Sequence, residues 1–190
     1  LILTLFPYTT LFRSALTTAA CALALATGAL TATPAPARAD DTITTQDYFS
    51  YYKLDSTRAK GYTGTGVTIA MVDGPVDTSA PELAGANITV KTPCKYEAVN
   101  ASKTHATAIA SILVSKNYGL APDATLIAYS TPSADDEESC THDEKLKSSS
   151  YGAFELAMND GAQVISYSRS DYNHEQAPLK WAIARAMAQG

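Results

Sequence analysis

Residues Gly64 to Pro75 read GTGVTIAMVDGP. Residues 67–72 form a run of apolar and β-branched side chains, which is typical of a strand buried on both faces of a parallel sheet. A Gly-Pro pair follows Asp73 and stops the run. The pattern therefore predicts a buried strand that carries the carboxylate of Asp73 at its C-terminal end.

Downstream of this strand, apolar β-rich runs alternate with helical patterns. We expect further strands at 87–91, 125–129 and 163–167, helices at 48–60, 105–115, 148–159 and 176–189, and an acidic loop at 133–143. Gly161 is expected to cap the third of these helices. Alternating strands and helices indicate an α/β fold, a mostly parallel sheet with helices on both faces. Functional sites of such sheets lie at the carboxyl ends of the strands, where we expect Asp73 and the residues after Ser166.

Asp73 and His105 form a candidate catalytic pair. A buried carboxylate can accept a hydrogen bond from one ring nitrogen of a histidine, which orients the ring and stabilises it when the other nitrogen takes a proton. At the start of a helix, His105 would be held rigidly. Such a pair is a general base that still needs a nucleophile. Taken alone, an aspartate and a histidine are more often a helix cap and a surface residue than a catalytic pair.

Four strings resemble segments of the subtilase family (peptidase S8, subtilisin-like serine proteases). They are GTGVTIAMVDGPVDTSAPEL (64–83), HATAIASIL (105–113), GLAPDATLIAY (119–129) and GAQVISYSRS (161–170), and they follow the order of the family. The resemblance covers roughly residues 50–190. It implies a subtilisin-like fold, here incomplete, and a serine endopeptidase that cleaves polypeptide substrates without a cofactor, with Asp before His before Ser in the chain.

The resemblance assigns roles to individual residues. It implies that Asp73 orients His105, the general base. Ser168, Arg169 and Ser170 match the edge segment whose backbone pairs with an extended peptide substrate. An aliphatic residue is common at the position of Arg169, which either alters the specificity pocket or is an exposed loop arginine.

Several positions depart from the family pattern. A hydroxyl residue and then glycine usually follow the catalytic aspartate, whereas Gly74 and Pro75 follow Asp73, so a hydroxyl that could help to hold the carboxylate is absent. Ala106 and Ser111 stand where the family usually has glycine, and Ala80 and Ala108 stand where it often has histidine. These departures keep an alternative open, a catalytically inactive subtilase homologue that acts as a binding or scaffold module.

The two ends of the chain predict its origin and location. Residues 5–14, LFPYTTLFRS, are identified as the translation of a sequencing adapter, so we interpret 1–14 as an artefact. Residues 15–39 have the apolar stretch and the Ala-x-Ala ending of a signal peptide, which predicts a secreted protein. Residues 40–190 then form the N-terminal part of the catalytic domain. The family's oxyanion asparagine and its serine, in a Gly-Thr-Ser segment, are expected beyond Gly190, so this chain alone is expected to be inactive.

Two cysteines remain after removal of residues 1–39. In an oxidising compartment we expect Cys94 and Cys140 to form a disulfide rather than two free thiols. We expect no metal site, because Glu82 is one carboxylate near a position that can bind calcium, and calcium takes six to eight oxygens. The acidic run 135–138 is interpreted as a solvated loop, with a preference for basic substrates as the alternative.

The charge and one glycine motif bear on three other classes of partner: nucleic acids, membranes and nucleotides. The net charge of −5 does not favour a nucleic-acid partner or membrane adhesion. Gly64-Thr65-Gly66 suggests a nucleotide-binding loop, but these glycines precede their strand, whereas a phosphate loop must follow one. The sequence leaves substrate specificity and oligomeric state open.

Overall fold

The computed structural model describes residues 42–132, 137–138, 140–169 and 177–189, all within one unit, Asp40–Gly190. Its main sheet has four strands in the order β2-β4-β1-β6, and every neighbouring pair is parallel. The strands are β1 (Thr68–Asp73), β2 (Asn87–Lys91), β4 (Thr125–Ser130) and β6 (Val164–Tyr167). This confirms the predicted parallel α/β sheet. Asp73 is the last residue of β1, which lies between β4 and β6.

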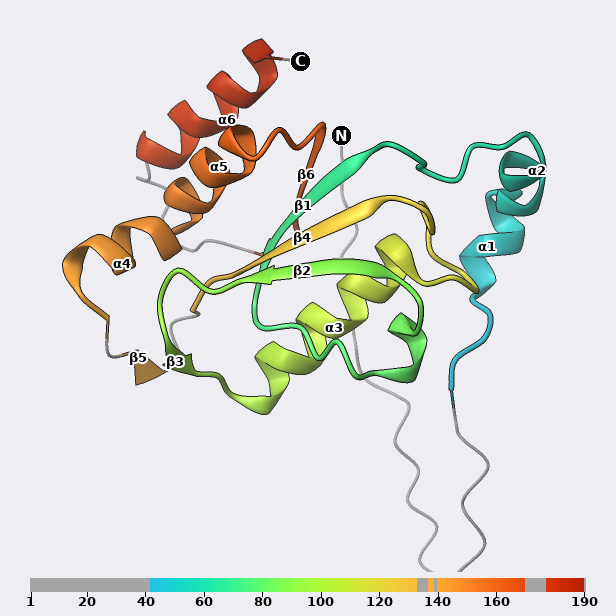
Figure 1. Cartoon of the computed structure of the whole chain (residues 1–190), viewed down its shortest axis with the longest axis horizontal. Helices are drawn as coiled ribbons and strands as arrows, with labels where there is room; N and C mark the ends of the chain where they lie inside the picture. The colour runs from blue at the N-terminus through green and yellow to red at the C-terminus, as the bar shows by residue number, and fades with distance from the viewer. Residues whose placement is uncertain (1–41, 133–136, 139, 170–176, 190) are drawn as a thin grey trace, which may run out of the picture. The chain divides into compact units, whose positions relative to one another are not determined.

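Helices cover both faces of the sheet (Figure 1). Side chains alternate along β1, so Ile69 and Met71 belong to the core cluster that includes α3 (Asn100–Val114). Ala70 and Val72 belong to the cluster on the other face, with residues of α5 (Ser150–Asn159) and α6 (Ala177–Gln189). Because both sets are buried, β1 needs apolar residues at every position, which explains the uninterrupted run in the sequence.

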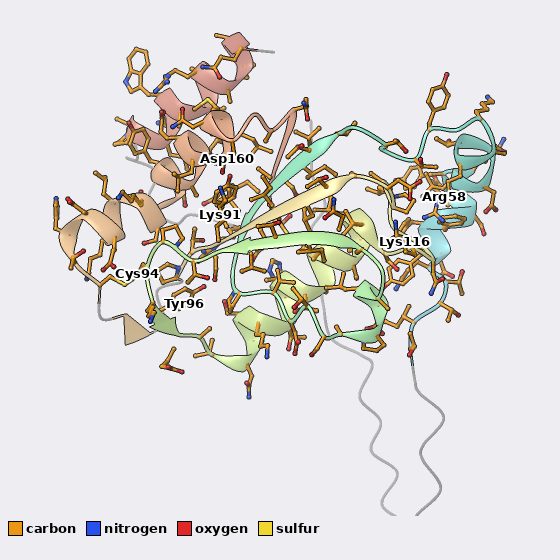
Figure 2. The ribbon with its side chains drawn as sticks, in the orientation of Figure 1. Arg58, Lys91, Cys94, Tyr96, Lys116 and Asp160 are labelled. Atoms are coloured by element: carbon orange, nitrogen blue, oxygen red, sulfur yellow. A yellow bond between two sulfur atoms is a disulfide. The ribbon has the colours of Figure 1, made fainter. Side chains whose placement is uncertain are left out.

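The N-terminal helical region consists of two short helices rather than the single helix expected at 48–60. These are α1 (Asp47–Tyr51) and α2 (Leu54–Ala59), separated by Lys53 in the left-handed conformation with φ 55°. The guanidinium of Arg58 on α2 donates to the carbonyls of Lys116, Asn117 and Gly119 at 2.6–3.1 Å. Figure 2 shows Arg58 and Lys116 side by side in this region. Contacts with a distant loop therefore decide where the helices lie, and local periodicity could not predict the break.

The start of α3 corrects a second expectation. The helix begins at Asn100, so His105 lies in its second turn and not at its beginning. Residues 100–104 contain one small apolar residue, and Val99 at the N-cap makes no side-chain capping bond. Neither an apolar stripe nor a cap therefore marked the true start.

The segment 133–143 is not the continuous loop that we expected. Residues Glu137–Glu138 form β5, which pairs antiparallel with β3 (Tyr96–Glu97). Helix α4 (His142–Ser148) begins with a capping box in which Thr141 and Glu144 bond reciprocally. This Thr-x-x-Glu signature was readable in the sequence. Residues 133–136 and 139 lie outside the described residues.

The remaining helices agree with the sequence pattern to within two residues. Helix α5 ends at Asn159, and Gly161 has the left-handed φ of 74° expected after a helix end. A short 3-10 helix, η1 (Pro81–Leu83), lies between β1 and β2. No helix in the described part of the chain is long and apolar enough to cross a membrane.

Candidate active site

Asp73 and His105 meet at the C-terminal end of β1. His105 Nδ1 lies 3.0 Å from Asp73 Oδ1. The carboxylate side chain is 4% exposed, while the imidazole is 49% exposed. The backbone N–H of Gly74 donates to the same oxygen at 2.7 Å. With its Nδ1 proton donated to Asp73, the ring presents Nε2 as a proton acceptor, which is the arrangement of a general base.

Gly74 allows the first turns of α3 to approach the end of β1. A Cβ atom at this position would collide with the hydroxyl oxygen of Ser102 and would lie 3.0 Å from the carbonyl oxygen of Ser102. The absence of a side chain at Gly74 therefore lets α3 pack closely enough for His105 to reach Asp73. The second carboxylate oxygen, Asp73 Oδ2, is buried without a hydrogen-bond partner among the described residues. A hydroxyl does lie near the strand end, but it belongs to Ser102 of α3 and not to the residue after Asp73.

The main chain of Asp73 is held by the loop after β4, a contact that the sequence did not indicate. The amide and the hydroxyl of Thr131 donate to the carbonyl oxygen of Asp73 at 2.8 and 3.1 Å. Beside it, Ser130 pairs with Asp73 across the sheet, and its hydroxyl lies 2.7 Å from the hydroxyl of Tyr96 on β3. Since Thr131 and Ser130 are each 1% exposed, these contacts fix the strand end in a buried environment.

The segment after β6 lies on the other side of β1. Ser168 is exposed. Arg169 is partly buried, and it donates to the carbonyls of Thr131 at 2.9 Å and Pro132 at 3.0 Å, and to the hydroxyl of Thr131. Of the two alternatives that the sequence left open for Arg169, the exposed loop arginine does not agree with these contacts. Ser170 lies outside the described residues.

Cys94 and Cys140 are joined by a disulfide with a Cα–Cα distance of 5.6 Å and a sequence separation of 46. The bond connects the segments that carry β3 and β5. Figure 2 shows Cys94 and Tyr96 close together at this end of the sheet. The disulfide therefore supports the element from which Tyr96 reaches Ser130.

The remaining sequence candidates have structural partners. Glu82, which we considered as a calcium ligand, accepts the N–H of Ile43 at 3.0 Å. Within the described ranges, no group of three or more His, Cys, Asp or Glu side chains is placed to hold a metal ion. Gly64 packs against Ala121, because a Cβ at Gly64 would lie 2.7 Å from that of Ala121. Close packing before β1, not phosphate binding, accounts for this glycine.

A cavity of about 510 Å³ lies between α3, the N-terminal arm and the loop after β1. Ala108, where the family commonly has a second histidine, lines it. At its rim Lys103 Nζ lies 3.1 Å from Asp77 Oδ2. The hydroxyl of Ser79, and then Lys103, lower the pKa of Asp77 to about 2 by hydrogen bonding to the carboxylate.

Comparison with known proteins identifies the family. A profile of the subtilase family matches residues 64–190. The chain belongs to the subtilase family. Its matched region contains Asp73, His105 and the segment after β6, and its parallel sheet is the subtilisin-like sheet in part. No curated protein matches the sequence.

Solved structures share this subtilase fold. The prenylagaramide maturation protease PagA is 24% identical, with 71% of this chain and 47% of that chain covered and a TM-score of 0.51. A mutant of the protease domain of PatA is 25% identical, with 67% and 48% covered and a TM-score of 0.52. MycP1 from the ESX-1 type VII secretion system is 20% identical, with 77% and 44% covered and a TM-score of 0.52. The chain therefore spans less than half the length of each of these structures.

Proposed function

We propose that this chain supplies the aspartate and the histidine of a secreted serine endopeptidase. The observation that carries the proposal is the hydrogen bond between Asp73 and His105 at the carboxyl end of a parallel sheet. Membership of the subtilase family supports proteolysis, and the signal-peptide pattern at 15–39 supports secretion. The nucleophilic serine comes from a segment outside the 190 residues.

In this reaction His105 moves the proton. Its Nε2 accepts the proton of the serine hydroxyl while the serine oxygen attacks the carbonyl carbon of the scissile peptide bond. It then donates this proton to the nitrogen of the leaving amine, and an acyl-enzyme results. The same nitrogen then deprotonates a water molecule, whose oxygen attacks the acyl carbon. The ester bond to the serine oxygen breaks, the imidazolium returns the proton to that oxygen, and the carboxylic acid leaves. Throughout, the carboxylate of Asp73 holds the ring in one tautomer and stabilises the imidazolium.

The peptide would bind beside the sheet as an added strand. The proposed edge is the segment after β6, of which the structure describes Ser168 and Arg169. Main-chain pairing of this kind tolerates varied side chains, so it suits a protease that acts on polypeptides. The 190 residues contain no Gly-Thr-Ser segment, and without the nucleophile no acyl-enzyme forms. We therefore expect the chain by itself to be inactive.

A second candidate is a peptide-binding module without catalysis. Two observations favour it, the departures at Ala106, Ala108 and Ser111 and the buried Oδ2 of Asp73 without a partner in the described structure. Such a module would use the same edge after β6 and would have no serine at the family's position.

A serine-directed fluorophosphonate probe distinguishes the two functions. The full-length gene product that contains this chain is treated with the probe, and the modified residue is located by mass spectrometry. A protease forms one adduct on a serine, and His105→Ala suppresses it, while His142→Ala, which alters an exposed histidine on α4, does not. Absence of an adduct on the folded wild-type protein would favour the binding module.

A further inference from the structure

The side chain of Arg169 spans the end of β1. In the sheet order, β4 and β6 lie on opposite sides of β1, about 10 Å apart. The register places Ser130 beside Asp73 and Tyr167 beside Val72, so Thr131 and Arg169 both lie just beyond the strand ends. The main chain of β1 leaves the sheet after Asp73, and the arginine side chain reaches across this gap.

Both outer nitrogens of the guanidinium donate hydrogen bonds to the loop after β4. Nη1 donates to the carbonyl and hydroxyl oxygens of Thr131, and Nη2 donates to the carbonyl of Pro132 at 3.0 Å. Two adjacent carbonyls match the planar fork of arginine, a geometry that a lysine ammonium cannot reproduce. We call these contacts the Arg169 strap.

The strap is continuous with the contacts that hold Asp73. The Thr131 hydroxyl accepts from Arg169 and donates to the carbonyl oxygen of Asp73, to which the Thr131 amide also donates at 2.8 Å. Thr131 is 1% exposed, so these bonds lie in a medium where water competes little. One buried residue thus joins the loop after β6 to the strand end that carries the catalytic carboxylate.

We propose that Arg169 is a positioning residue that holds the peptide-binding edge after β6 in its binding conformation beside the end of β1. The inference rests on the proposed protease function. It differs from both alternatives that the sequence left open for Arg169, an altered specificity pocket and an exposed loop arginine, because the guanidinium binds Thr131 and Pro132 and so orients the edge. Binding of every peptide should depend on it, whatever the charge of the peptide.

Steady-state kinetics of the full-length protease test this role. Arg169→Met should raise KM roughly tenfold, with kcat changed less than twofold, and to the same extent for acidic, neutral and basic peptides. A loosened edge must be ordered when the peptide binds, whereas the bound peptide meets an unchanged Asp73–His105 pair. Arg169→Lys should restore part of the loss. The matched control is Arg185→Met on α6. The guanidinium of Arg185 lies 2.6 Å from the carboxylate of Glu155 on α5, outside the candidate site.

A double-variant cycle tests the path through Thr131. If Arg169 acts through this residue, Arg169→Met/Thr131→Val should raise KM no more than the larger of the two single changes. Additive effects would show that Arg169 acts by another route. A loss confined to acidic peptides would show that Arg169 reads the substrate. A KM equal to that of Arg185→Met would show that the strap does not position the edge.

Amide exchange separates failure of the strap from failure of the proposed function. In the same full-length protein, exchange of the Thr131 amide should rise at least about tenfold in Arg169→Met and remain unchanged in Arg185→Met. Suppose that the wild-type protein cleaves no peptide but the Thr131 amide exchanges faster in Arg169→Met. Then the proposed protease function is wrong, and so is the role of Arg169 in substrate binding, while the Arg169 strap still connects the two loops. Unchanged exchange would overturn the strap itself.

Discussion

His105 Nδ1 lies 3.0 Å from Asp73 Oδ1, which joins the second turn of α3 to the last residue of β1. The two residues are 32 positions apart in the chain. The carboxylate of Asp73 is buried and held in place, whereas the imidazole of His105 is half exposed and accessible to a substrate. This asymmetry is what a general base requires.

Removal of His105 should abolish proteolysis by the full-length protein. His105→Ala eliminates the proton acceptor, and we expect kcat to fall by about 10⁴-fold or more. Asp73→Asn should cause a comparable loss, because an amide can hold the ring in the wrong tautomer. Initial rates on a fluorogenic peptide measure both, with His142→Ala as the control. Residual activity above a tenth of the wild type in His105→Ala would contradict the assignment.

A side chain at Gly74 should disturb the packing of α3. Gly74→Ala places a Cβ against the hydroxyl and carbonyl of Ser102, and overpacking of this kind costs roughly 1–3 kcal/mol. We expect a lower Tm and slower catalysis, because His105 moves with the helix. Thermal unfolding of the full-length protein gives the first readout. Ser102→Ala should restore part of the stability in the double variant, and a fully stable Gly74→Ala would refute the close approach.

Loss of the disulfide should destabilise the domain and loosen β3. The bond closes a span of 46 residues, for which the loop-entropy model gives roughly 4 kcal/mol. Cys94→Ala/Cys140→Ala should therefore lower the midpoint of urea unfolding. Wild-type protein unfolded after reduction with a thiol should show the same lowered midpoint. If the bond is absent, alkylation of the unreduced wild-type protein will label both cysteines.

The carboxylate of Asp77 should make stability depend on pH at the acidic end. Hydrogen bonds from Ser79 and then Lys103 lower its pKa to about 2. Because the folded-state pKa lies below the ordinary value near 4, the contribution is present above pH 4 and is lost as the pH falls toward 2. Carbon-13 NMR of the carboxyl group measures the titration directly. Ser79→Ala should raise this pKa, and Asp77→Asn should flatten the stability curve between pH 4 and 2. An Asp77 that titrates near pH 4 would contradict the contacts.

Local patterns predicted the main sheet well. The apolar run at 67–72 matches β1 (Thr68–Asp73) to within one residue, and the β-rich run at 125–129 lies within β4, since strands buried on both faces need such residues throughout. Local patterns failed where distant contacts decide the backbone. Arg58 binds the loop at 116–119 and Lys53 adopts a left-handed conformation, so the expected helix 48–60 is broken into two.

The four strings and their order in the sequence predicted the family and paired Asp73 with His105, because residue type and chain order suffice to recognise a motif. Only the tertiary structure decided how the pair is held. The space above Gly74, the bonds from Thr131 to the Asp73 carbonyl and the reach of Arg169 across β1 all join residues that are distant in the chain. Such contacts depend on strand order and register, which appear only when parallel strands bring separate loops to the same edge of the sheet.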